Sequence, residues 1–419
     1  MTTWRRCIFA LALAFAIAFT TGCRVAAGPQ VTLEFWTISL QPFFTDYING
    51  LIAAYERANP GVKITWVDVQ LQAIEQKMLA ALAGRVAPDV VNLNVEFTVR
   101  IAERNALVDL DDAVPGTERA KYFEGLWTSA RFKGRTFGIP WYIAPPVLMY
   151  NTELFKKAGL DPMNPPATED EMIQAARQIK DRAKVYGFMP LVDGTRLMHR
   201  FLENGLPVLS SDGKRAVFNS PAHAAYLQRY IELYKRDYFP EDTLRRGFTG
   251  AVERFSAGQL GMLVTGPQFL LRVKASNPEV YAQTSVAPYP AGKGKVIHAG
   301  LMTLTVPRAS RHQQEAMKFA LYVTNDENQL AFSRLAVTLP STKRAAADPF
   351  FKQSGAGPES KAREIAADEL ESSRDLTVVV SNQSELYKIF REAVEGAFFG
   401  KMSARQALDW AVREWNARL

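Results

Sequence analysis

Cysteine is nearly absent from this chain of 419 residues, and both cysteines, Cys7 and Cys23, lie within its first 23 residues. The rest of the chain therefore holds no disulfide and must rely on packing, which a chain of this length supplies because it can bury a large core. The four histidines show no paired spacing of the kind that zinc ligands use. The sequence thus indicates neither a disulfide framework nor a metal site.

Enzyme motifs are missing as well. The chain has no phosphate loop and no Gly-x-Ser-x-Gly elbow. We therefore expect no enzyme activity and no cofactor. A secreted glycosidase-like enzyme stays an alternative, because carboxylates are plentiful and catalysis by two carboxylates depends on a separation that a sequence does not display.

One-sided charge is also lacking. The formal net charge of +7 becomes +5 once Arg5 and Arg6 of the leader are subtracted, and the basic residues are scattered among nearly as many acidic ones. No basic helix, stripe or tail appears, which excludes nucleic acid as an expected partner.

Long apolar runs are confined to the start of the chain. Two arginines precede the apolar residues 8–19, and Cys23 follows a small glycine. The run is shorter than the about 20 residues that a membrane-spanning helix needs, and its basic start and small-residue end are typical of a removed secretory signal. The segment resembles the signal peptides of bacterial lipoproteins, although Thr20 stands where these usually carry an aliphatic residue.

That resemblance implies a signal peptide over residues 1–22, acylation of Cys23, and a lipidated tether over 23–30. Plain secretion or an uncleaved anchor are the alternatives. The mature protein is then expected in the periplasm or on the outer face of the cytoplasmic membrane, held there by its lipid.

After residue 30 the chain alternates between strand-like and helix-like segments. Residues 31–38, 62–69 and 88–93 are β-branched or apolar runs typical of strands, and residues 43–58, 78–82 and 96–104 have helical character. This order predicts an α/β fold with a mainly parallel sheet covered on both faces. Ligands bind at the carboxyl ends of such strands, which places Ser39, Gln41, Asn94 and Glu96 at the expected edge.

Short stretches over nearly the whole mature chain resemble, in the same order, the extracellular solute-binding proteins of ATP-binding cassette importers. The resemblance is to the carbohydrate-binding family that includes maltose-binding protein. The stretches are LEFW at 33–36, YERANP at 55–60, APDVV at 87–91, GIPWY at 138–142, LMYNTELF at 148–155, FSAGQLGM at 255–262, TGP at 265–267, residues 300–307 leading into EAMKF at 315–319, and LPS at 339–341.

The resemblance implies a two-lobe periplasmic-binding-protein fold of type II, with hinge crossovers and a ligand cleft between the lobes. The three crossings are expected near residues 143–148, 298–300 and 340–343. The first lobe is expected to hold residues 31–143 plus 300–340, and the second 148–298 plus 343–419. The implied function is capture of a sugar or related polyol by a monomer that delivers it to the membrane permease subunits of the importer. We expect the amphipathic terminal helix, 404–419, to pack on the second lobe.

A sugar cleft needs aromatic rings for the C–H faces of the sugar and polar groups for its hydroxyls. Trp141 and Tyr142, just before the first crossing, are predicted to supply rings to the cleft rather than to the core. On the second lobe the resemblance points to Asp193 and Arg196, with His199 nearby. An anionic solute such as glycerol phosphate is the rival ligand that Arg196 and His199 favour.

Relatives often carry Trp where this chain has Gln268. A stacking ring must then come from Phe269 or from Tyr387, or the ligand is smaller. In the same loop Gly266 is a further candidate, and Gly300 is expected to let the backbone approach the ligand.

Overall fold

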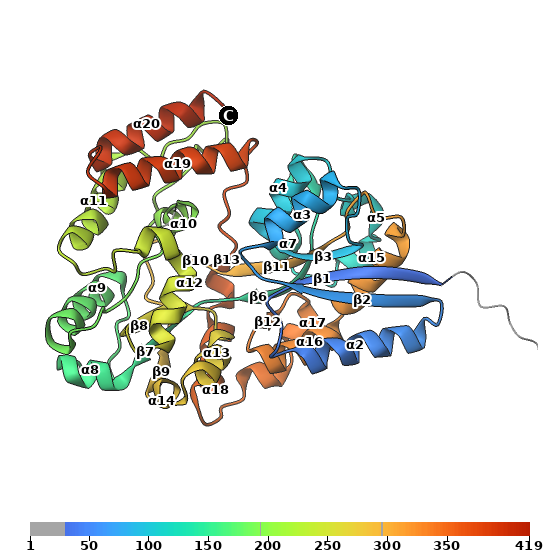
Figure 1. Ribbon diagram of the computed structural model, residues 1–419, viewed down its shortest axis with the longest axis horizontal. Helices are drawn as coiled ribbons and strands as arrows, with labels where there is room; N and C mark the ends of the chain where they lie inside the picture. The colour runs from blue at the N-terminus through green and yellow to red at the C-terminus, as the bar shows by residue number, and fades with distance from the viewer. Residues whose placement is uncertain (1–29, 193, 295) are drawn as a thin grey trace, which may run out of the picture.

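The computed structural model describes residues 30–192, 194–294 and 296–419, which form two lobes side by side (Figure 1). The predicted signal peptide and Cys23 lie outside the described residues, as does Asp193. Within the described part, no helix combines the length and apolar character that a membrane span needs.

The first lobe is built on a six-stranded sheet with the order β12-β6-β11-β3-β1-β2. The three strands predicted from the sequence are confirmed within two residues. The strands are β1 (Val31–Ile38), β2 (Val62–Val69), β3 (Val90–Asn94), β6 (Ile139–Ala144), β11 (Gly300–Thr305) and β12 (Leu339–Pro340).

The sheet is mixed rather than mainly parallel. Strand β1 pairs in parallel with β2 and β3, whereas β11 pairs antiparallel with β3 and β6, and β12 antiparallel with β6. Four strands therefore share one direction and two oppose it. The reason is connectivity: β6 carries the chain out toward the second lobe, and β11 carries it back.

Both faces of this sheet are buried, as predicted. Along β1, Phe35 packs with one apolar cluster and its neighbour Trp36 with the other. Alternate side chains of a strand point to opposite faces, so an apolar run can serve two cores. The covering helices are α2 (Thr45–Ala58), α3 (Ile74–Ala83), α4 (Val95–Glu103), α5 (Leu110–Ala113), α7 (Glu124–Trp127), α15 (Gln313–Val323) and α16 (Asp326–Ala336), with the short hairpin β4 (Arg131–Phe132) and β5 (Arg135–Thr136) and the exposed turn α6 (Gly116–Arg119) beside them.

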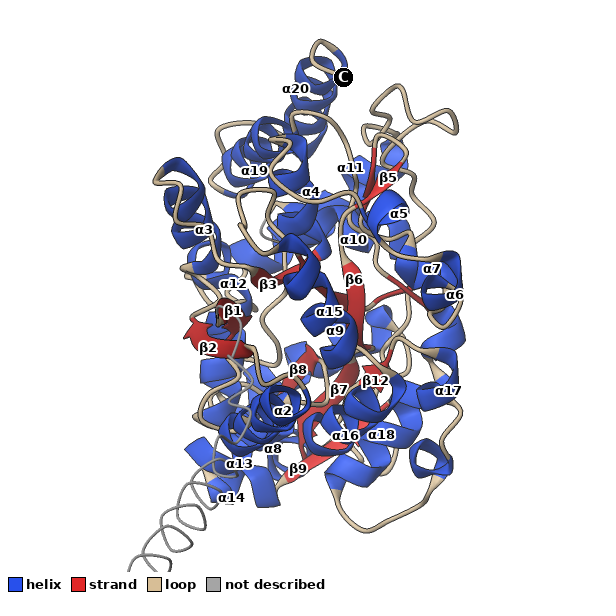
Figure 2. Cartoon of the chain, turned by 90° about the vertical axis from the view of Figure 1, so that its right-hand side faces the viewer, coloured by secondary structure: helices blue, strands red, loops and turns tan. Residues whose placement is uncertain are grey.

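The second lobe has a smaller sheet of three strands, in the order β8-β7-β9. Strand β7 follows β6 after two prolines, and in the view of Figure 2 strands β7, β8 and β9 lie in the lower half of the molecule with helices around them. The elements are β7 (Val147–Asn151), β8 (Met262–Thr265), β9 (Thr284–Ala287), α8 (Thr152–Ala158), α9 (Glu169–Gln178), the π-helix η1 (Ile179–Ala183), α10 (Thr195–Glu203), α11 (Pro221–Lys235), α12 (Thr243–Ser256), α13 (Phe269–Ser276), α14 (Pro278–Ala282) and α18 (Pro358–Asp368).

Two helices at the end of the chain complete the second lobe, α19 (Gln383–Phe398) and α20 (Ala404–Asn416). Ser403 caps the start of α20 with a capping box. The Ser403 hydroxyl accepts from the Gln406 backbone amide, and the Gln406 side-chain oxygen accepts from the Ser403 backbone amide. Trp415 is fully buried in the second-lobe core, and its indole donates to the Leu386 carbonyl at 2.8 Å. The predicted packing of the terminal helix on the second lobe is confirmed.

Residues just beyond the predicted third crossing, 340–343, still contact the first lobe. Lys343 begins the short helix α17 (Lys343–Ala346), and its backbone amide donates to the Lys121 carbonyl of the first lobe. Phe351, in the 3-10 turn η2 (Pro349–Lys352), packs in a first-lobe cluster, whereas α18 packs on β9. The predicted lobe boundaries stay a prediction, and these contacts favour a third crossing after residue 351.

A small pair of strands joins the lobes near the second crossing. Strand β10 (Ile297–His298) runs parallel to β13 (Ser373–Arg374), which follows the turn η3 (Leu370–Ser372). The Asp375 carboxylate then accepts from the Leu301 amide at 3.3 Å, and thus ties the end of this pair to the start of β11.

Candidate functional site

A cavity of about 510 Å³ lies where the two lobes meet. The first lobe lines it with the end of β3, the start of α4, β6 and β11, and the second with α10, α12, β8 and the start of α13. This volume falls within the range of about 300–1,000 Å³ that small-molecule sites occupy. The cavity is therefore the candidate binding site.

Most of the predicted site residues line this cavity. Their contact with a solute stays a prediction. The eight that line it are Asn94, Glu96, Tyr142, Arg196, Gly266, Gln268, Phe269 and Gly300.

The first-lobe wall is held by a helix cap and by ion pairs. Asn94 ends β3 and caps α4, with its side-chain oxygen accepting from the Phe97 amide at 2.8 Å. Glu96, in the first turn of α4, pairs with Arg100 one turn later, and Arg100 also binds Glu75 at 2.8 Å. The strand end and the helix start thus fix the position of both predicted polar residues.

The prediction that Trp141 supplies a ring to the cleft is wrong. Its side chain is fully buried in the first-lobe core and does not line the cavity. Its ring stacks on Phe332, with centroids 5.1 Å apart and planes at 29°. Strand β6 lies inside the sheet rather than at its edge, so a large ring on its covered face is core. The next residue, Tyr142, packs on the same Phe332 but also reaches the cavity.

Three further predicted residues stand apart from the cavity lining. Tyr387 is buried in the second-lobe core, where its hydroxyl donates to the Val378 carbonyl at 2.7 Å, so it presents no stacking face. Ser39 accepts from the Leu71 amide at 3.2 Å, and the backbone of Gln41 is bound by Asp68. Ser39 and Gln41 lie at the expected edge of the sheet, but β3, β6 and β11 form the first-lobe wall of the cavity instead.

The second-lobe wall is one face of α10. Arg196, His199, Arg200 and Glu203 all line the cavity, at helical spacing of three and four residues. Residues so spaced lie on the same side of a helix. The helix begins after Gly194, whose φ of 57° suits glycine, and a side chain there would meet Arg391 on α19.

Glu203, the last residue of α10, is the centre of a hydrogen-bond network at that end of the wall. One carboxylate oxygen binds Arg200 at 2.8 Å and accepts from the Tyr289 hydroxyl at 2.7 Å, while the other accepts from the His298 backbone amide at 2.9 Å. Burial raises the pKa of Glu203 to about 7, although the Arg200 charge opposes the shift. The carboxyl thus holds together three elements that line the cavity.

A second buried carboxylate, that of Glu169 on α9, contacts the end of the same helix. Glu169 accepts from the hydroxyls of Tyr226 and Tyr230 and from the Asn204 amide at 3.2 Å. The field of Glu169 also acts on Arg200. Arg200 is therefore compensated by two acidic side chains.

Two imidazoles stack beside this network. The rings of His199 and His298 have centroids 3.8 Å apart, and His298 Nδ1 accepts from the Leu376 amide at 3.1 Å. Burial lowers the pKa of His199 well below its usual range, and the nearby His298, Arg196 and Arg200 add to the effect. Burial also lowers the pKa of His298, against the opposing charge of Asp375. Both rings are thus held neutral at pH 7.

Two polar atoms at the cavity have no hydrogen-bond partner in the described protein. They are the Thr265 hydroxyl at the end of β8 and the side-chain oxygen of Gln268. Gln268 lies directly against Gly266, where any side chain would collide with its amide. Buried polar atoms are rarely left unpaired, because each costs about 1–3 kcal/mol.

Several lining residues were not predicted from the sequence. The 196, 199, 200 and 203 spacing on α10 was a readable signal for Arg200 and Glu203. No such signal exists for Leu71, Phe248 or Asp375, because each comes from a different element and meets the others only in the fold.

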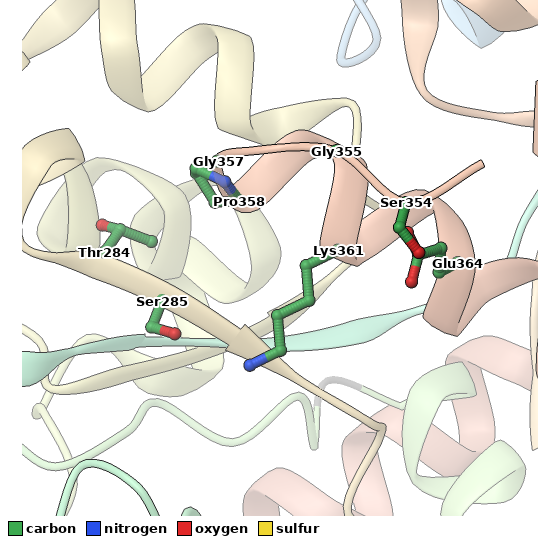
Figure 3. Close-up of a pocket in the computed structure, with 8 residues that line it drawn as sticks. All are labelled: Thr284, Ser285, Ser354, Gly355, Gly357, Pro358, Lys361 and Glu364. Atoms are coloured by element: carbon green, nitrogen blue, oxygen red, sulfur yellow. The ribbon is translucent and has the colours of Figure 1, made fainter.

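A second hollow, of about 450 Å³, lies between β9 and the start of α18 (Figure 3). Lys361 extends across it toward Ser285, as Figure 3 shows. None of its eight lining residues has a buried side-chain polar atom without a partner, and it contains no predicted site residue. It therefore lacks the features that distinguish the inter-lobe cavity.

In the described part of the chain, no group of three or more His, Cys, Asp or Glu side chains is placed to hold one metal ion.

Two α/β lobes around an inter-lobe cavity define the class of two-lobe solute-binding proteins. Residues 42–330 match the family of bacterial extracellular solute-binding proteins, and the chain belongs to that family. The match covers more than half of the chain.

Individual relatives agree with this assignment. A putative oligosaccharide periplasmic-binding protein from Synechococcus sp. MITs9220, solved in complex with zinc, is 31% identical, with a TM-score of 0.84 over 92% of this chain and 98% of that one. The sn-glycerol-3-phosphate-binding periplasmic protein UgpB of Salmonella typhimurium is 25% identical over 98% of this chain and 96% of its own length. An uncharacterized lipoprotein in the oleD 5' region of Streptomyces antibioticus is 24% identical over 81% of this chain and 77% of its own length.

Proposed function

We propose that this protein is lipid-anchored, captures a neutral sugar or related polyol in the inter-lobe cavity, and delivers it to the permease of an ATP-binding cassette importer. The observation that carries the proposal is the pair of unpartnered polar atoms at the cavity, on Thr265 and Gln268. A rotation of the Gln268 and Thr265 side chains toward the cavity would let a solute hydroxyl donate to the Gln268 oxygen and pair with the Thr265 hydroxyl, so solute binding would remove a standing desolvation cost.

The charges along the cavity favour a neutral solute over an anion. Two arginines, Arg196 and Arg200, line it together with three acidic side chains, Glu96, Glu203 and Asp375. Arg200 is already bound by Glu203. The cavity therefore has no excess of positive charge with which to attract a phosphate.

An anionic solute such as a glycerol phosphate is the second candidate. It is supported by the arginines of α10 and by the relatives that are named as sn-glycerol-3-phosphate-binding proteins. The two candidates differ in their dependence on salt, because a charged solute binds less tightly as ionic strength rises.

The carboxyl groups of the cavity support a binding role rather than a glycosidase. Glu203 already accepts bonds from Arg200, Tyr289 and a backbone amide, and Asp375 accepts from the Leu301 and Thr377 amides. Glu96 is paired with Arg100. A general acid or base must reach the substrate, and these groups are used to hold the walls.

The experiment is a thermal-shift screen of the purified mature protein against neutral monosaccharides, disaccharides and polyols, with sn-glycerol 3-phosphate as the anionic probe. A solute that binds only the native state raises the melting temperature, and the shift grows with the ratio of its free concentration to its dissociation constant. We expect a neutral sugar or polyol to give the largest shift and to be recovered unchanged. A shift with the anion alone, or conversion of the sugar, would contradict the proposal.

The anchor is tested separately. Cys23 is the only cysteine near the proposed cleavage point, so Cys23→Ser should release the protein from membranes without changing its melting temperature. Retention of a processed Cys23→Ser protein on membranes would contradict lipidation.

A further inference from the structure

Three of the aromatic side chains that line the cavity, Phe97, Phe248 and Phe269, are only half-buried and keep surface for a solute. Phe97 lies on the first lobe and packs against its core. Phe248 on α12 and Phe269 at the start of α13 meet on the second lobe, with ring centroids 5.0 Å apart and planes at 85°. Two perpendicular rings form a corner, in which a sugar that lies flat on one ring has the other ring at its side.

Phe248 reaches this corner through a break in its helix. At Gly247, inside α12, φ is 42° and ψ is −131°, which lie outside the helical range. Glycine adopts a positive φ without the steric cost that other residues meet. An ion pair across the break holds its two sides together, because Arg254 donates to both carboxylate oxygens of Asp242 at 3.0 Å. The break thus sets the direction of the residues that follow Gly247, of which Phe248 is the first.

A hydrogen-bonding group lies beside the Phe248 ring. The Arg196 guanidinium, at the start of α10, is 5.0 Å from the centre of this ring, and both side chains line the cavity. An apolar ring surface next to N–H donors matches a cyclic sugar, whose C–H face adjoins a rim of hydroxyls. An acyclic polyol has the hydroxyls but no flat C–H face, so it would use the donors and not the ring.

The residue after Phe248 contacts the other lobe. The Thr249 hydroxyl accepts from the side-chain amide of Gln72 at 2.9 Å, and Leu71, next to Gln72, lines the cavity. On each lobe a residue that lines the cavity is therefore adjacent to one that makes the bridge. The bridge holds Phe248 at the cavity while the two lobes are together.

We propose that Phe248, aimed by the break at Gly247, is the ring on which the solute stacks, and that the solute is a cyclic sugar rather than an acyclic polyol. This inference rests on the proposed function, which leaves both classes of solute open. It assigns the stacking role to α12, whereas the sequence pointed to Trp141, Phe269 or Tyr387.

The test compares glucose, galactose and mannose with the alditols glucitol, galactitol and mannitol by isothermal titration calorimetry, with sucrose, trehalose and maltose as larger cyclic sugars. We expect the best cyclic sugar to bind at least about tenfold more tightly than any alditol, since only the cyclic sugar stacks. An alditol that binds within tenfold of the best cyclic sugar would overturn the inference and leave the proposed function standing. If nothing in the set binds, the proposed function fails and takes the inference with it.

Variants of the two rings locate the stacking. Phe248→Leu keeps apolar volume but removes the ring, so the affinity for the best cyclic sugar should fall about tenfold. Phe269→Leu should cost less, because Phe269 stands beside the stacked sugar. Phe399→Leu, at an exposed ring elsewhere in the second lobe, is the control and should keep full affinity. Wild-type affinity in Phe248→Leu, or an equal or larger loss in Phe269→Leu, would overturn the assignment.

Gly247→Ala tests how the ring is aimed. Alanine disfavours a positive φ, so this change should weaken binding of the same sugar to the otherwise wild-type protein. In the Phe248→Leu background it should add less than about a twofold loss, because both changes act through one ring. Unchanged affinity in the wild-type background, or equal losses in both backgrounds, would overturn the role of Gly247.

Discussion

The two walls of the cavity are positioned by different forces. The first-lobe wall, including Asn94 and Tyr142, is fixed by a six-stranded sheet with apolar cores on both faces. The second-lobe wall, on α10, is fixed by the buried polar network around Glu203. Apolar packing does not respond to pH, whereas buried titratable groups do. The first lobe thus provides a platform held mainly by apolar packing, and the second lobe provides a wall whose stability depends on the protonation of buried groups.

Removing Trp141 should have the largest effect and should act through the first-lobe core. We expect Trp141→Ala to lower the free energy of unfolding by about 3–5 kcal/mol, because the change leaves a cavity beside Phe332. Denaturant unfolding measures this loss. Phe399→Ala, at an exposed ring, should cost less than about 0.5 kcal/mol. A Trp141→Ala protein that keeps its stability but loses solute affinity would show instead that Trp141 contacts the solute.

Glu203→Gln should have the next largest effect, through the second-lobe wall. The carboxylate accepts from Arg200, Tyr289 and the His298 amide, and an amide group cannot accept at both of its ends. We expect a loss of about 1.5–3 kcal/mol in the free energy of unfolding, the range for hydrogen bonds to charged groups. Glu153→Gln on α8, an exposed residue, is the matched control. An unchanged stability would show that the network does not hold the wall.

The Glu203→Gln variant also tests how the stability of the wild-type protein depends on pH. Because the pKa of Glu203 is raised to about 7 in the folded protein, the folded state holds this proton more tightly than the unfolded state does. The stabilising contribution is present at low pH and is lost as pH rises from about 4.5 to about 7. His199 and His298, whose pKa values are lowered, give the opposite slope below about 6.5. The stability difference between wild type and Glu203→Gln should therefore shrink as pH rises, and a difference that is constant between pH 5 and 8 would contradict this assignment.

Gln268→Met should separate binding from stability. Methionine keeps the length of the side chain and removes the unpartnered oxygen, so the protein without solute should lose no stability. Solute affinity should fall by about 1–2 kcal/mol, which calorimetry measures. Gln259→Met, at an exposed position in the same lobe, should leave affinity unchanged. A Gln268→Met protein with full affinity would remove the observation on which the proposed function rests.

The bridge between Gln72 and Thr249 should give the smallest effect. A single exposed hydrogen bond contributes about 0.5–1.5 kcal/mol, so Gln72→Ala should speed solute dissociation by up to about tenfold. Thr249→Val should have a similar effect, and the double variant should add little, because both remove the same bond. Stopped-flow measurement of dissociation tests this. Additive effects would show that the two residues act independently.

The sequence predicted the elements of the fold well where apolar patterning is strong. The strands over 31–38 and 62–69 have the predicted bounds, because β-branched runs between helical segments have few other solutions. The direction of β11 and β12 was not predicted, since it depends on how often the chain returns from the second lobe. That is a property of tertiary connectivity.

The candidate site was harder to predict because neighbouring residues have different environments. Trp141 and Tyr142 are adjacent, yet one is core and the other reaches the cavity. Residue type alone does not distinguish them, because both aromatic side chains suit a core and a sugar site equally. On α10 the helical spacing from Arg196 could have identified Arg200 and Glu203, which were not predicted, whereas the approach of His298 to His199 depends on a crossing far along the chain.

Small-angle scattering of the mature protein, with and without the solute that gives the largest thermal shift, tests the central claim most directly. A solute that touches both walls binds the closed arrangement of the lobes better than an open one and therefore shifts the population toward it. The account predicts that the radius of gyration falls on saturation, and falls less at the same solute concentration in Gln72→Ala. An unchanged radius of gyration at full saturation would contradict the claim that both lobes hold the solute.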